Sequence, residues 1–157
     1  MGNKKTIIVF SGDLDKAMAA FIIATGAAAM GDEVTMFFTF WGLNILRKAR
    51  KVRVKKDFFE RMFGFMMPRG PEKLGLSKMN FGGLGARMMR YIMKRKNVDT
   101  LNQLMQNAQA LGVKIIACTM SMDVMGIKKE ELIDGIDYAG VATYLGEADE
   151  ANVNLFI

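Results

Sequence analysis

The chain has 157 residues, of which 51% are apolar, so it is long enough for one domain with a substantial core. It contains one cysteine and no histidine, which excludes an intrachain disulfide, a Cys–His or Ser–His pair and the usual zinc sites. The net charge is +6, and 15 residues are methionine.

The first elements alternate between strand and helix. The stretch "KKTIIVFSGD" is typical of a buried strand that ends in a turn. Residues 13–30 follow as a helix that Ser11 or Asp13 could cap and that ends before Gly31. Its apolar part is too short for a membrane span, so we expect a helix that is buried on several sides. A second strand is predicted over residues 33–40.

A basic insert at residues 44–96 interrupts this alternation of strands and helices. It contains 16 Lys and Arg residues against three acids, a net charge of +13 that leaves −7 for the rest of the chain. Phe58, Phe59, Met62, Phe63 and Met66 fall on one helical stripe beside basic residues. That pattern suits a helix at an anionic membrane or an acidic partner, and equally a helix docked on its own core with its charges in solvent. Nucleic acid is the least supported partner, because the phenylalanines lie in apolar stripes rather than on a stacking platform.

After the insert, strands and helices alternate again. Residues 97–112 form an amphipathic pattern that ends at Gly112, and "VKIIAC" is typical of a buried strand. The terminal stretch "DYAGVATYLGEADEANVNLFI" predicts a short strand, a helix and a last strand. Apolar strands that alternate with helices predict a three-layer α/β/α fold of Rossmann or flavodoxin type, with a mainly parallel sheet of about five strands.

Cys118 is the leading candidate for a functional residue. It lies at the carboxyl end of the predicted strand, where ligands bind in open α/β sheets. Thr119 or Ser121 could cap a helix that follows, and a thiol at such a helix start is favoured as the thiolate. The alternative is an inert, buried cysteine, because free cysteine is among the most buried residue types. Asp123 could oppose the thiolate if it lies close to it.

Two other segments are weaker candidates. Phe40 and Trp41 end the second predicted strand, so they could wall an apolar pocket over the thiol or simply pack in the core or in a subunit interface. Residues 11–16, "SGDLDK", resemble the phosphate loop of ATP pyrophosphatases, but Asp13 and Lys16 replace a glycine and a serine of that loop. An ordinary capped turn is the better interpretation, since a carboxylate would repel phosphate.

Three stretches resemble the DsrE/DsrF-like family of sulfur-relay proteins, in the DsrE-like branch that has an extended middle. They are "KKTIIVFSGDLDKAMAAFIIATGAAAMGDEVTMFFTFWGL", "VKIIACTMSMDVMGI" and "YAGVATYLGEADEANVNLFI". The resemblance implies an α/β subunit that forms homo-oligomers, often trimers or hexamers, and that carries sulfur as a cysteine persulfide. Cys118 matches a family cysteine. Some relatives have a second cysteine near the segment "FTFWGL", where this chain has none, so a transfer between two thiols of one chain is excluded.

We therefore expect one domain over residues 1–157 that acts as a sulfur carrier, a candidate persulfide sulfurtransferase, in the cytoplasm. Cys118 would accept sulfur, Thr119, Ser121, Met120 and Trp41 would shape its site, and Met122 and Met125 would add polarizable sulfur around it. Thiol exchange needs neither cofactor nor metal. The partners would be a sulfur donor and a sulfur acceptor. The alternative is a non-catalytic oligomeric scaffold that uses residues 44–96 at the inner membrane surface or on a partner protein.

Overall fold

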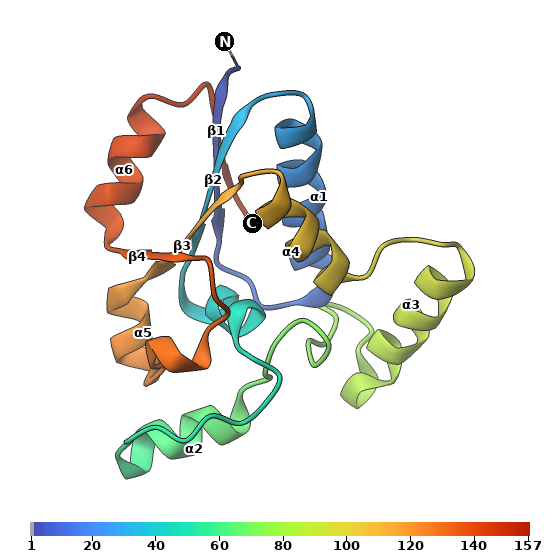
Figure 1. Cartoon of the computed structure of the whole chain (residues 1–157). Helices are drawn as coiled ribbons and strands as arrows, with labels where there is room; N and C mark the ends of the chain where they lie inside the picture. Colours follow the sequence, from blue (N-terminus) through green and yellow to red (C-terminus); the bar gives the residue numbers. More distant parts are fainter. Residues whose placement is uncertain (1) are drawn as a thin grey trace.

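The computed structural model describes residues 2–157 and has a five-stranded sheet at its centre (Figure 1). The order of the strands is β4-β3-β2-β1-β5, and all neighbouring strands pair in parallel. The predicted α/β fold with a parallel sheet is confirmed. The strands are β1 (Lys4–Val9), β2 (Glu33–Phe38), β3 (Lys114–Cys118), β4 (Asp137–Ala139) and β5 (Val153–Phe156).

Helices cover both faces of this sheet. Helices α1 (Leu14–Ala29) and α4 (Leu101–Ala110) lie together on one face, and α5 (Thr119–Met125) and α6 (Val141–Asp149) lie on the other (Figure 1). The main core fills the space between the sheet and α1 and α4, and it continues below the carboxyl ends of the strands into α5. Long apolar strands require this double cover, because neither face of a parallel sheet can be left in water.

The second strand is shorter than predicted, because the chain turns sharply after Phe38. Phe40 has a φ of 46° and opens the 3-10 helix η1 (Phe40–Leu46), which passes under the carboxyl ends of the strands. A side chain at Gly42 could not be accommodated there, since its Cβ would lie 2.0 Å from the carbonyl oxygen of Val9. Residues 43–46 are buried in the core, and so is Arg47.

The insert holds two α helices, α2 (Phe58–Met66) and α3 (Leu84–Arg95), which project beyond the carboxyl ends of the strands (Figure 1). A 3-10 turn, η2 (Phe81–Gly83), leads into α3, and another, η3 (Lys129–Glu131), follows α5. Most of the remaining insert is extended chain with no regular secondary structure. No helix within residues 2–157 is long and apolar enough to cross a membrane.

A buried ion cluster fastens the insert to the rest of the chain. Arg47 is 1% exposed and donates hydrogen bonds to the carbonyl oxygens of Gly64, Met67 and Pro68. Its guanidinium lies 3.8 Å from the carboxylate of Glu131, which also accepts a 2.8 Å hydrogen bond from Lys56. Burial, and then the neighbouring charge of Arg69, lower the pKa of Arg47, while Glu131 opposes that shift.

The insert also forms hydrogen bonds with the first turn of α1. The backbone N–H of Leu14 donates to the carbonyl oxygen of Gly75 at 2.7 Å, and Asp15 accepts hydrogen bonds from the backbone and side chain of Ser77. At the other end of this segment, Arg90 of α3 donates to the carbonyl oxygens of Pro71 and Leu74. The segment of residues 71–77 is thus held from two sides.

Replacing Arg47 tests the ion cluster. Arg47→Met keeps most of the side-chain volume but leaves three carbonyl groups without a donor and weakens the charge balance around Glu131. We expect a loss of about 3 kcal/mol in the free energy of unfolding, measured by urea denaturation. Lys48→Met is the control, because Lys48 reaches only the fully exposed carboxylate of Asp134 at 3.9 Å, and it should cost less than about 0.5 kcal/mol. Equal losses in the two variants would contradict the role of the cluster.

Candidate functional site

Cys118 is the last residue of β3 and the N-cap residue of α5. Strand β3 lies inside the sheet, with Ala117 paired to Phe38 of β2 and Cys118 paired to Ala139 of β4. The thiol is therefore at the carboxyl edge of the sheet, as the position of the cysteine in the sequence predicts.

The Cys118 side chain points toward α6. Ile115 and Ala117 of β3 belong to the main core, whereas Ile116 and Cys118 pack in a second, smaller cluster with Phe37 and Tyr144, as strand alternation requires. Cys118 is 3% exposed, so in this conformation the thiol is covered. The candidate nucleophile thus lies in an apolar setting.

Tyr144 of α6 is the residue that closes this smaller cluster. Its ring stacks on that of Phe37 with a centroid distance of 5.2 Å. Its hydroxyl lies 3.1 Å from the hydroxyl oxygen of Thr6, which gives this buried group a hydrogen-bond partner. The ring and the hydroxyl of Tyr144 are therefore both held by contacts. Because Tyr144 belongs to α6, the burial of Cys118 depends on the packing of α6 against the sheet.

The residues after the cysteine form a short helix without the predicted cap. Neither Thr119 nor Ser121 caps α5, because Cys118 itself takes the N-cap position and makes no side-chain cap hydrogen bond. Ser121 is fully buried, and its hydroxyl lies 2.7 Å from that of Thr39. This contact ties the end of β2 to α5. The part played by Thr39 could not be predicted, since the two residues are 82 positions apart.

Met120 and Trp41 lie on the surface, with 60% and 48% of their side chains exposed. Trp41 lies in η1, three residues after the end of β2, so it is on the same side of the sheet's carboxyl edge as Cys118. Met122 and Met125 pack in the main core and not in the cluster of Cys118. The cluster that contains Cys118 is thus aromatic and aliphatic, and Met120, Met122, Met125 and Trp41 are not among its members.

Two backbone N–H groups in the loop at residues 11–16, those of Ser11 and Leu14, are already used in hydrogen bonds to carbonyl groups. The N–H groups of Phe10 and Ser11 donate to the carbonyl oxygen of Ile157, and that of Leu14 donates to Gly75. Lys16 lies 3.8 Å from the carboxylate of Asp13. A phosphate loop needs free backbone N–H groups. These groups already have partners, which supports the interpretation as an ordinary turn.

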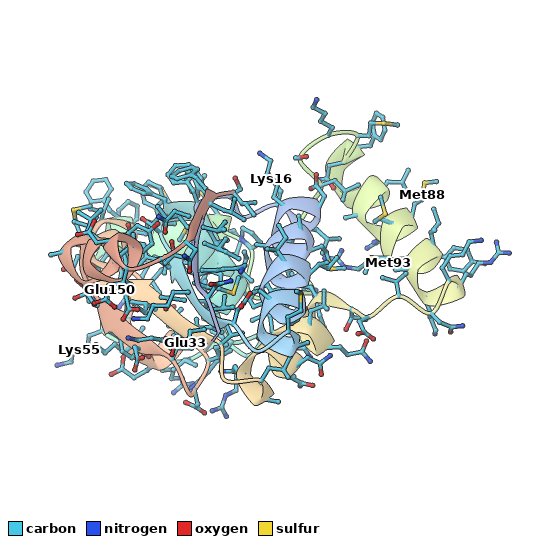
Figure 2. The ribbon with its side chains drawn as sticks, turned by 90° about the horizontal axis from the view of Figure 1, so that it is seen from above. Lys16, Glu33, Lys55, Met88, Met93 and Glu150 are labelled. Carbon is cyan, nitrogen blue, oxygen red and sulfur yellow. The ribbon has the colours of Figure 1, made fainter. Side chains whose placement is uncertain are left out.

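The apolar stripe of the insert faces solvent. Phe58, Phe59, Met62, Phe63 and Met66 of α2 are all exposed, while Gly64 on the opposite side of the helix is buried. Helix α3 likewise exposes Met88, and its Met93 lies on the side toward α1 (Figure 2). Of the two alternatives for α2, docking of this stripe on the chain's own core is therefore wrong.

Comparison with known proteins places this chain in a family. The model of the DsrE/DsrF/DrsH-like family matches residues 2–156, and the chain belongs to that family. It is 39% identical to the sulfur carrier protein DsrE2 of Allochromatium vinosum, over 98% of both chains. It is also 61% identical to the uncharacterized protein YrkE of Bacillus subtilis, over 98% of this chain and 96% of that protein.

Solved structures agree on the fold. The ychN protein of E. coli superposes with a TM-score of 0.56 at 12% identity, covering 98% of this chain and 99% of that one. MTH1491 of Methanobacterium thermoautotrophicum, a protein of unknown function, gives a TM-score of 0.54 at 11% identity, covering 99% of both chains. The family match and the relationship to a sulfur carrier support a role in sulfur relay.

The cover over Cys118 can be tested by alkylation of the native protein. Tyr144→Ala removes the stacked ring, and we expect it to cost about 3 kcal/mol and to raise the alkylation rate of Cys118 by at least about tenfold. Tyr144→Phe, which loses only the hydrogen bond, should raise that rate by less. The control is Leu145→Ala on the exposed side of α6, which should leave it within about twofold. Rapid labelling of the unmodified protein would contradict a buried thiol.

Proposed function

We propose that this chain carries sulfane sulfur as a persulfide on Cys118 and passes it to a partner protein. The observation that carries the proposal is the position of the chain's one cysteine at the carboxyl edge of the sheet, in a chain related over its whole length to a sulfur carrier. We assign this carrier function to a single domain of residues 1–157.

The chemistry is thiol exchange and needs no external oxidant. The Cys118 thiolate attacks the outer sulfur of a donor persulfide, a new S–S bond forms, the donor's S–S bond breaks, and the donor leaves as a thiolate. In the second step an acceptor thiolate attacks the outer sulfur on Cys118, and the Cys118 thiolate leaves. Because the chain has one cysteine, both donor and acceptor must be other molecules.

The burial of Cys118 sets a condition on this exchange. A sulfur atom that is covered by Tyr144 and Phe37 can be attacked only when α6 or the β3–α5 junction moves. The same cover would protect a persulfide from water and from unrelated thiols between transfers. We infer that docking of a partner favours the open arrangement, which couples sulfur exchange to recognition.

The setting we propose for this work is the cytoplasm, where thiols stay reduced. The exposed apolar residues on and just after α1, Ile22, Ile23 and Met30, suit contacts with other copies in a trimer or hexamer. Donor and acceptor proteins would then bind at the carboxyl edge of the sheets.

Loading with sulfur tests the role of Cys118. After incubation with a low-molecular-weight persulfide, the intact mass of the native protein should rise by one sulfur atom per chain, and Cys118→Ser should gain none. Met120→Leu serves as the matched control, because it removes an exposed sulfur-containing side chain next to Cys118 and should load fully. Sulfur uptake by Cys118→Ser would contradict the proposal, and so would a native protein that remains unloaded.

One observation favours a second function, contact of the insert with an anionic membrane surface. Helix α2 presents aromatic side chains to solvent, among them Phe65 with 91% of its side chain exposed, beside a strongly basic stretch of chain. Exposed apolar faces with neighbouring Lys and Arg are typical of helices that lie at a membrane surface. Such contact would place the carrier at the inner membrane, with or without sulfur on Cys118.

Flotation with vesicles tests the membrane contact. The protein should float with vesicles that contain anionic lipid at low salt, and less so at high salt. Phe58→Ser with Phe65→Ser should reduce the floating fraction at least about tenfold. The matched control, Val124→Ser with Val141→Ser, changes two exposed apolar residues outside the insert and should float like the native protein. A native protein that never floats would remove this second function.

A further inference from the structure

A large cavity lies within the insert, apart from the thiol. It has a volume of about 1120 Å³ and is bounded by the extended segment of residues 49–56, by α2 and by the chain that follows α2. Ligand clefts in proteins have volumes of about 300–1,000 Å³, so this one could hold a ligand of nucleotide size.

Positive charge converges on this cavity. Six cationic side chains line it: Lys51, Arg53, Lys56, Arg61, Arg69 and Lys73. The one carboxylate in its wall belongs to Glu131, which is already paired with Lys56 and lies near Arg47. Within residues 2–157, the other five cations form no salt bridge. Like charges that meet without counter-charges repel each other and create a strong positive potential, which an anion would relieve.

Buried contacts hold one part of this cavity in place. Lys56 is held by its 2.8 Å contact with the buried carboxylate of Glu131, and Met67 and Pro68 are held by the buried guanidinium of Arg47. By contrast, the segment of residues 49–56 has no regular secondary structure. Side chains on such a segment can close over a ligand when their charges gain a partner.

The walls are apolar as well as basic. Val52, Val54, Phe65, Met66 and Met67 contribute to the same surface. A small inorganic anion would use only the charges, whereas a ligand that combines clustered phosphates with an organic part would use both kinds of side chain. Arginine in particular binds phosphate oxygens through two parallel hydrogen bonds, and three arginines line the cavity.

We propose that this cavity binds a soluble organic polyphosphate. Its phosphate groups lie among Arg53, Arg61 and Arg69, and its organic part lies against Phe65 and Met66. Binding orders the segment of residues 49–56. The site is separate from Cys118, and the proposal does not depend on the sulfur-carrier role.

Calorimetric titration of the full chain with ATP and with inorganic tripolyphosphate tests this site. We expect saturable binding of one ATP per chain, with a lower affinity for tripolyphosphate because it lacks the organic part. The triple variant R53Q/R61Q/R69Q should weaken ATP binding by about a thousandfold, since each of the three lost charged contacts costs about tenfold. K94Q/R95Q/K96Q removes the same net charge from exposed positions that do not line the cavity, and it should change the affinity by less than about threefold.

Hydrogen exchange gives a second readout. Addition of ATP should slow exchange in residues 49–56 of the native chain and of Cys118→Ser alike. Three results would overturn the proposal: no saturable binding of either probe at millimolar concentration, an equal loss of affinity in the two triple variants, or binding to anionic vesicles with none to ATP. Absence of binding would show a cationic surface that takes no ligand. Equal losses in the two variants would show attraction by net charge alone. Binding to vesicles without binding to ATP would show a lipid site.

Discussion

The buried carboxylate of Glu131 is the contact on which the arrangement of this molecule depends. It lies between Arg47 and Lys56, at the start of the insert, and it belongs to the chain that follows α5. Arg47 and Lys56 are buried cations, which are costly unless they are paired, so the packing of this part of the insert depends on that partner. Lys128 and Glu60 add a second link, at 3.4 Å, between the same two segments. The insert is therefore linked, through the chain that follows α5, to the helix for which Cys118 is the N-cap residue.

For the sulfur transfer that we propose, this connection is a physical route between the insert and the thiol. The thiol is covered by α6 on one side of the sheet, and the helix that starts at Cys118 contacts α2 of the insert. In the proposed transfer, a shift of α2 would reach α5 through these contacts, and through α5 the junction that contains the thiol. A single cysteine cannot pass sulfur within its own chain, so an open state that appears only with a partner would keep the persulfide from being lost to solvent thiols.

The sequence was sufficient to predict the sheet but not the contacts that hold the insert. Strands β1 to β3 are apolar runs with turn residues after them, and this pattern led directly to a parallel sheet with Cys118 at its carboxyl edge. The 3.6-residue period predicted helix α2 correctly, yet periodicity cannot say whether an apolar stripe faces a core or solvent. The pairs Lys56–Glu131 and Thr39–Ser121 join residues 75 and 82 positions apart, and each residue alone looks like an ordinary surface group. The predicted cap on α5 is wrong for the same reason, because the hydroxyl of Ser121 contacts Thr39, a residue far from it in the sequence.

Three features lie at or beyond the carboxyl edge of the sheet: the covered thiol, the exposed apolar face of α2 and the cationic cavity of the insert. We propose above all that Cys118 carries sulfur in the living cell. The most direct measurement is mass spectrometry of the Cys118 peptide after cells that produce this protein are lysed in an alkylating reagent. We predict an alkylated persulfide on that peptide as a substantial fraction of the total. Alkylated thiol alone, under conditions in which persulfides on other proteins are preserved, would contradict the account.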